Sequence, residues 1–235
     1  MPDRFNFATD IVDGWAQEEP DKLALLWCND AGDERRFSFA DISLISARAA
    51  VALKRLGLRR GDTILLLLKR RWQFWVLAPA CIRLGIVFIP ATTQLTKKDI
   101  AYRCKAASVR AIITIPEPDL TQAVAEAAAE CPDIDNICYI RSEPLAAALE
   151  PAFTPPADWL ELNELVAEVS ESEAKELRVQ PPAAGGEDPM LIYFTSGTTG
   201  WPKMVLHDNN HPLGHIITAR YWQQLGPDDL HISVA

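Results

Sequence analysis

The sequence lacks a long apolar segment, an excess of basic residues and a closely spaced pair of cysteines. Its longest apolar stretch, residues 74–82, contains Pro79 and falls far short of the roughly 20 residues that a membrane-spanning helix needs. The net charge is -9, from 23 basic and 32 acidic residues, so the surface is not built to neutralise nucleic-acid phosphates. From these absences we expect no membrane span and no nucleic-acid partner.

The five cysteines do not form the pattern of a disulfide framework or of a zinc site. Cys28, Cys81, Cys104, Cys131 and Cys138 are odd in number and include no C-x-x-C pair, which predicts reduced intracellular thiols without a chemical role. The first 15 residues carry three aspartates and no apolar core, unlike a secretory signal or an Arg-rich transit peptide. The cytoplasm is therefore the expected location, and a mitochondrial one is left open.

Apolar periodicity predicts an α/β fold. A helix is expected at residues 9–17, a hairpin at 23–27 and 35–39, and a long helix at 38–56. Four buried strands and three helices then alternate: strands at 64–68, 86–89, 109–114 and 136–140, and helices at 72–84, 97–106 and 119–130, the first of them kinked or interrupted at Pro79. Such alternation is typical of largely parallel sheets flanked by helices.

Residues 143–189 differ from the rest in composition. They contain seven prolines, with acidic and alanine-rich stretches between them, and predict a Pro-rich surface excursion. A short helix is expected near residues 161–169, and residues 181–188 read as a flexible approach to an ordered element. That element is an apolar strand at residues 190–194, which leads directly into the most informative part of the chain.

Residues 195–203, Thr-Ser-Gly-Thr-Thr-Gly-Trp-Pro-Lys, have the composition of a phosphate-binding loop. Glycines let consecutive backbone N–H groups turn toward one anion, hydroxyl groups add rotatable donors, and a lysine adds positive charge. The spacing matches neither G-x-x-x-x-G-K-[ST] nor G-x-G-x-x-G. The predicted ATP phosphate ligands are Thr195, Ser196, Gly197, Thr198, Thr199, Gly200 and Lys203.

The loop and its surroundings resemble a known family. Residues 193–203, Tyr-Phe-Thr-Ser-Gly-Thr-Thr-Gly-Trp-Pro-Lys, are similar to the phosphate-loop signature of the adenylate-forming (AMP-binding) superfamily. Residues 5–15, 80–90, 92–100 and 219–222, and Met204 with His207, look most like the medium-chain acyl-CoA synthetases. The resemblance covers nearly the whole chain and is weakest from 143 to 188. It implies that residues 1–235 are an incomplete part of the large amino-terminal domain, without the carboxy-terminal domain.

The resemblance also implies a reaction. A carboxylic acid, a medium-chain fatty acid in these relatives, reacts with ATP and Mg²⁺ to give an acyl-adenylate, and CoA then takes the acyl group. The loop would hold the β- and γ-phosphates, with Lys203 stabilising the departing pyrophosphate. The family's catalytic residues would lie beyond Ala235, so the 235-residue chain is expected to be inactive by itself. Two alternatives stay open: a non-catalytic truncated nucleotide-binding protein, and an adenylating enzyme with another acyl acceptor.

Three histidines and three tryptophans attract attention outside this scheme. His207, His211 and His215 recur every four residues, as metal ligands on a helix would. Pro212 and Gly214 are expected to interrupt such a helix, so no metal site is predicted. A packing or hydrogen-bonding role is expected for His207. Core packing is likewise predicted for the three tryptophans, Trp72, Trp75 and Trp201.

Overall fold

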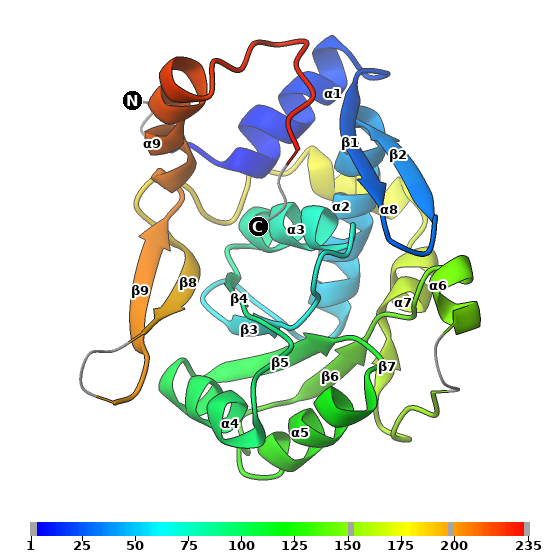
Figure 1. Cartoon of the computed structure of the whole chain (residues 1–235). Coiled ribbons are helices and arrows are strands. Elements are labelled where there is room, and N and C mark those ends of the chain that lie inside the picture. Colours follow the sequence, from blue (N-terminus) through cyan, green and yellow to red (C-terminus); the bar gives the residue numbers. More distant parts are fainter. Residues whose placement is uncertain (1–3, 150–152, 197–199, 233–235) are drawn as a thin grey trace.

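The computed structural model describes residues 4–149, 153–196 and 200–232. Within these ranges the main sheet has seven strands in the order β7-β6-β5-β3-β4-β8-β9, and all neighbours are parallel except β8 and β9. The strands are β3 (Thr63–Leu66), β4 (Val87–Pro90), β5 (Val109–Thr114), β6 (Asn136–Tyr139), β7 (Leu160–Glu161), β8 (Pro189–Thr195) and β9 (Lys203–Asp208). The prediction of a largely parallel α/β sheet is confirmed (Figure 1).

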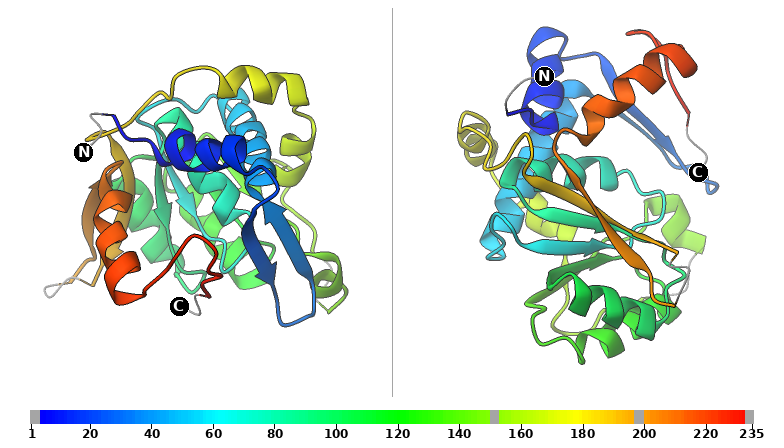
Figure 2. Two further views of the ribbon diagram at one scale, coloured as in Figure 1. Left: turned by 90° about the horizontal axis from the view of Figure 1, so that it is seen from above. Right: turned by 90° about the vertical axis from the view of Figure 1, so that its left-hand side faces the viewer.

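Helices cover both faces of the central strands. Helices α2 (Phe39–Arg55) and α3 (Phe74–Leu84) lie on one side, and α4 (Lys97–Ala106) and α5 (Pro118–Ala128) on the other (Figures 1 and 2). Ile64, Leu65, Ile112 and Ile113 are consequently fully buried, as a sheet covered on both faces requires. None of the described helices is long and apolar enough to cross a membrane.

The helix boundaries follow from local sequence. Ser38 and Asp41 form a capping box at the start of α2, and Thr96 and Asp99 form another at the start of α4. Gly85 ends α3 with a φ of 69°, a left-handed conformation that favours glycine. Helix α3 runs through Pro79, so the predicted interruption is wrong.

An amino-terminal layer packs beside α2 and α3. It comprises η1 (Phe7–Asp13), α1 (Gly14–Glu18) and the predicted hairpin, formed by β1 (Leu23–Cys28) and β2 (Glu34–Ser38). A buried ion pair fastens it: the Arg83 guanidinium donates to both carboxylate oxygens of Asp13, over 2.6 and 3.1 Å. Ser43 of α2 donates its hydroxyl to the same carboxylate over 2.5 Å. Three elements therefore meet at one buried carboxylate.

The segment from 143 to 189 is more ordered than its prolines suggest. It adds α6 (Pro144–Leu149), the edge strand β7, α7 (Leu162–Ala167) and α8 (Glu171–Arg178), and the last two pack on α2. Leu162, Val169 and Ala174 are buried, so the prediction of a surface excursion is wrong for this part. Apolar residues spaced along short helices give the segment a face that the core covers.

Residues 181–188, predicted to be flexible, are held by backbone contacts. The Ala183 N–H donates to the Arg83 carbonyl oxygen over 3.0 Å, and the Gly186 N–H donates to that of Phe5 over 2.9 Å. The buried Asn6 side chain donates to the Ala184 carbonyl oxygen over 2.9 Å. A side chain at Gly185 would bring a Cβ within 3.0 Å of a backbone carbonyl oxygen, so glycine permits this close approach.

The cysteines, all in the described part of the chain, are free thiols. Burial raises the pKa of Cys81 and brings those of Cys104 and Cys138 to about 12. Such thiols stay protonated at neutral pH, and the thiolate is the nucleophile. The structure therefore agrees with packing roles for these three residues.

Candidate nucleotide-binding site

The predicted phosphate loop begins at the carboxyl end of β8. Strand β8 runs parallel to β4, with Phe88 opposite Leu191, so both strands end at the same edge of the sheet. Ligands of open α/β sheets bind outside this edge. Strand β9 returns antiparallel and places Lys203 directly opposite Thr195, which closes the loop at its base (Figure 1).

Four of the seven predicted ligands lie in the described part of the loop. Thr195, Ser196, Gly200 and Lys203 are all exposed, and the Thr195 hydroxyl donates to the Lys203 carbonyl oxygen over 3.5 Å. Gly200 has a φ of 128°, which side chains rarely adopt, although nothing crowds its Cβ position. The other three predicted ligands lie outside the described residues: Gly197, Thr198 and Thr199.

Lys203 places a positive charge at the base of the loop. No carboxylate of the described residues lies within ion-pair distance of its ammonium group. A lysine charge about 4 Å from a phosphate charge contributes roughly 4 kcal/mol at an effective dielectric of 20. The exposed side chain is thus available to an anionic ligand.

Helix α4 holds the carboxyl-terminal part of the loop. The Tyr102 hydroxyl donates to the Pro202 carbonyl oxygen over 2.9 Å, and the Tyr102 and Trp201 rings stack with centroids 4.5 Å apart. The Trp201 indole also contacts Lys98, whose ammonium group lies 4.7 Å from the ring centroid. We call Lys98, Tyr102 and Trp201 the loop clamp. Sequence reasoning missed it, although positions 98 and 102 are neighbours on a helix surface.

The prediction of core packing is wrong for two of the three tryptophans. Trp201 is 48% exposed and Trp75 is 54% exposed. Trp201 precedes the edge strand β9, where no further strand covers it. Trp72 is partly buried and donates its indole N–H to Glu143 over 2.6 Å.

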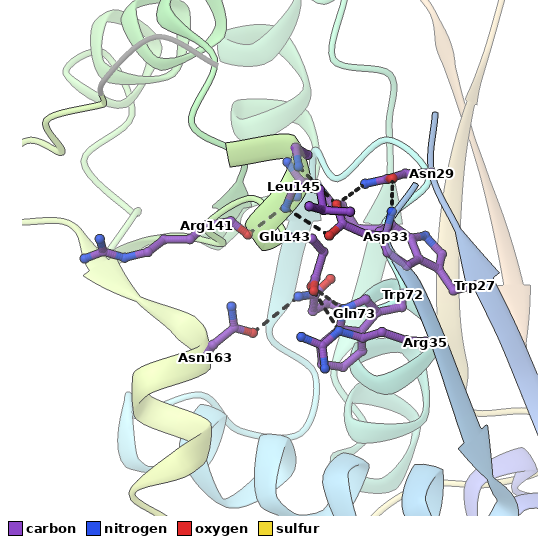
Figure 3. A network of polar contacts seen from close by, with 12 residues as sticks. Trp27, Asn29, Asp33, Arg35, Trp72, Gln73, Arg141, Glu143, Leu145 and Asn163 are labelled. Atoms are coloured by element: carbon purple, nitrogen blue, oxygen red, sulfur yellow. Dashed lines mark hydrogen bonds and ion pairs between the residues drawn. The ribbon is translucent and has the colours of Figure 1, made fainter. Parts of the chain in front are cut away.

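A polar cluster surrounds Glu143, next to Arg35 of β2 and to Trp72 (Figure 3). The buried Glu143 carboxylate pairs with Arg35 over 2.7 Å and accepts the Trp72 N–H. A shallow cavity of about 360 Å³ adjoins these residues.

Asp33, between β1 and β2, accepts hydrogen bonds from the Asn29 side chain and from two backbone N–H groups of α6. Burial acts to raise the pKa of Asp33, but these hydrogen bonds outweigh it and lower that pKa. These contacts tie the β1–β2 hairpin to α6 and give the cluster a structural role.

Comparison with known proteins identifies the class. The sequence model of the AMP-binding enzymes matches residues 12–235, and the chain belongs to this adenylate-forming family. It is 37% identical over 237 residues to the acyl-coenzyme A synthetase ACSM4, mitochondrial, of Homo sapiens, covering 98% of this chain and 38% of that protein. It is 35% identical to the acyl-coenzyme A synthetase ACSM5, mitochondrial, of Homo sapiens, with the same two shares covered.

A solved structure shares the fold. The anthranilate CoA ligase AuaEII, in complex with anthranoyl-AMP, matches with a TM-score of 0.77 at 21% identity. The match covers 94% of this chain and 38% of that one. The present chain therefore spans 38% of the length of the relatives and of this structural neighbour.

Proposed function

We propose that these residues are part of an AMP-forming acid–thiol ligase that activates a medium-chain fatty acid and transfers it to CoA. The observation that carries the proposal is the glycine- and hydroxyl-bearing loop at the carboxyl edge of the sheet, closed by Thr195 and Lys203. Membership of the AMP-binding enzymes and the acyl-coenzyme A synthetase names of the relatives support it.

The loop supplies electrostatic stabilisation in the first step. A carboxylate oxygen attacks the α-phosphorus of ATP, the bond to the bridging oxygen breaks, and pyrophosphate leaves. Hydroxyl groups of Thr195 and Ser196, backbone N–H groups and the Lys203 ammonium hold the β- and γ-phosphates while charge develops on them. The predicted roles of Gly197, Thr198 and Thr199 belong to the same proposal.

The second step transfers the acyl group to sulfur. The CoA thiol, losing its proton, attacks the acyl carbon of the adenylate, and AMP leaves with the electron pair of the broken bond. CoA is proposed as the acceptor because the relatives are named acyl-coenzyme A synthetases and the structural neighbour a CoA ligase.

Mg²⁺ enters this scheme as the ion of the Mg–ATP substrate. Magnesium prefers phosphate oxygens, water and one or two protein oxygens. The exposed hydroxyl groups of Thr195 and Ser196 are oxygen donors of this kind. Across residues 4–149, 153–196 and 200–232, no group of three or more His, Cys, Asp or Glu side chains is arranged to hold a metal. The residues present fit an ion carried mainly by the phosphates.

We also propose a domain assignment and a location. Residues 1–235 are proposed to make up part of the AMP-binding amino-terminal domain, with the carboxy-terminal domain outside this sequence. The cytoplasm stays the predicted location from the composition of residues 1–15, while the names of the relatives favour the mitochondrion.

The test is substrate-dependent exchange of labelled pyrophosphate into ATP, with octanoate as the probe acid. It is run on the 235-residue chain and on the longer product obtained by reading the gene past the codon for Ala235. We expect exchange, and octanoyl-CoA once CoA is added, from the longer product, and no activity from the chain alone. No exchange with any carboxylic acid would favour the non-catalytic alternative, and exchange without transfer to CoA would favour another acceptor.

A further inference from the structure

The histidines of β9 and α9 come together where the sequence predicts a broken helix. Helix α9 (His211–Ile217) contains both Pro212 and Gly214. Proline is tolerated in the first turn of a helix because its missing N–H has no partner there in any case. The expected interruption is therefore wrong, and His211 and His215 lie one turn apart on the same helix face. His207, at the end of β9, packs with its ring centroid 4.0 Å from that of His211.

The separation of the His211 and His215 nitrogens suits a shared metal ion. Their Nε2 atoms are 3.1 Å apart. Two imidazole nitrogens bound at about 2.0–2.1 Å to one ion are separated by about 2.9 Å at a right angle and about 3.4 Å at the tetrahedral angle. The observed distance lies between these values. The same distance also fits a hydrogen bond between two neutral rings. Both Nε2 lone pairs become available to a metal ion once the donor ring carries its proton on Nδ1.

The net charge of the protein does not oppose cation binding. The protein as a whole carries a net charge of -9, so a cation is not repelled.

We propose that His211 and His215 bind one late first-row divalent ion, such as Zn²⁺, Ni²⁺ or Cu²⁺, as a two-nitrogen pair. Imidazole nitrogen selects these ions over Mg²⁺ and Ca²⁺, which take oxygen ligands. Because the described residues contain no arrangement of three or more such ligands, water completes the coordination shell. This site lies on α9 and is independent of the proposed ATP chemistry.

The test is calorimetric titration of the purified chain with Zn²⁺. The exposed thiol of Cys28 is a competing ligand, so all proteins carry Cys28→Ser. We expect one ion per chain. His211→Ala or His215→Ala should weaken Zn²⁺ binding by at least about tenfold, because losing a residue that only supports a metal ligand already weakens affinity by about that factor. The matched control is His231→Ala, which removes the fourth histidine of the chain and should leave the affinity unchanged.

Two further measurements separate ligand loss from misfolding. His211→Gln and His215→Gln keep a polar side chain of similar length, and circular dichroism checks that each variant retains its helices. Equal affinity in the parent and in either helix variant would overturn the proposal, as would a loss of binding in His231→Ala alone.

Discussion

The hydroxyl group of Tyr102, in α4, donates a hydrogen bond to the carbonyl oxygen of Pro202, at the end of the phosphate loop. The Tyr102 ring also stacks on Trp201, at an interplanar angle of 19°. Tyr102 thus contacts two consecutive residues of the loop, through a hydrogen bond to Pro202, 100 positions away, and through stacking on Trp201. A well-packed helix thereby positions a loop whose own exposed residues provide little packing.

If the loop clamp positions the phosphate ligands, Tyr102→Phe should raise KM for ATP more than KM for the acid. Loss of one hydrogen bond costs about 0.5–1.5 kcal/mol, which is roughly a 2- to 10-fold change. Tyr102→Ala also removes the stacking and should have the larger effect. Steady-state kinetics of the longer product measures both values. The exposed Tyr221→Phe is the control, and equal effects of the two Phe variants would contradict the account.

Gly200 should be intolerant of a side chain for conformational reasons. Its φ of 128° strains any other residue, at a cost of about 1–3 kcal/mol, although space for a Cβ exists. Gly200→Ala should therefore weaken ATP binding, measured by calorimetry on the longer product. Gly214→Ala is the matched control, because the added Cβ also meets open space and alanine favours a helix by about 1 kcal/mol. Unchanged ATP affinity in Gly200→Ala would argue against a constrained loop.

The ion pair of Asp13 with Arg83 should dominate the stability of the amino-terminal layer. Removing one partner leaves the other charge buried, which costs about 3–5 kcal/mol. Asp13→Ala should lower the free energy of unfolding by this amount in urea titrations. Glu19→Ala, which removes only an exposed ion pair with Lys22, should change it by about 0–1 kcal/mol. Similar losses in the two variants would contradict the role of the buried pair.

Glu173 should link stability to acidic pH. The hydroxyl and backbone N–H of Ser170 and the Arg55 guanidinium lower the pKa of Glu173 from 4.5 to about 2. Since the folded state holds the lower pKa, the ionised form stabilises folding fully above about pH 4.5, and this contribution is lost as pH falls through about 2. Glu173→Gln should thus be less stable than the parent near neutral pH.

Urea unfolding as a function of pH measures this link. The difference between Glu173→Gln and the parent should shrink as the pH falls from about 4.5 to about 2. Glu168→Gln serves as the control, because Glu168 is exposed, ends α7 and belongs to no capping box. A difference that does not depend on pH would point to a packing effect in place of the charge.

Local patterns made much of the fold predictable. The uninterrupted apolar run at residues 64–68 correctly indicates a strand buried on both faces, and residues 109–114 form a strand as predicted. The structure places a capping box of four residues at the start of α2 and another at the start of α4. The phosphate loop is equally local, because its glycines, hydroxyls and lysine lie within nine consecutive positions.

What the sequence does not reveal depends on contacts between distant residues or on exact position in an element. Asp13 and Arg83 are separated by 70 positions, and neither has a neighbour that marks it as a partner. A proline in the interior of a helix interrupts it, whereas a proline in the first turn, such as Pro212, is tolerated. Composition alone does not distinguish these two positions. Trp201 is apolar enough for the core, yet its place at the edge hairpin leaves it exposed.

We propose that Lys203 and the loop before it bind the phosphates of ATP during adenylate formation. The most direct test compares carboxylate-dependent ATP–pyrophosphate exchange in the parent longer product, in Lys203→Ala and in the exposed control Lys54→Ala. We expect Lys203→Ala to lose about 1.5–3 kcal/mol of transition-state stabilisation, roughly a 10- to 150-fold fall in exchange rate, and Lys54→Ala to be unaffected. An exchange rate in Lys203→Ala equal to that of the parent would contradict it.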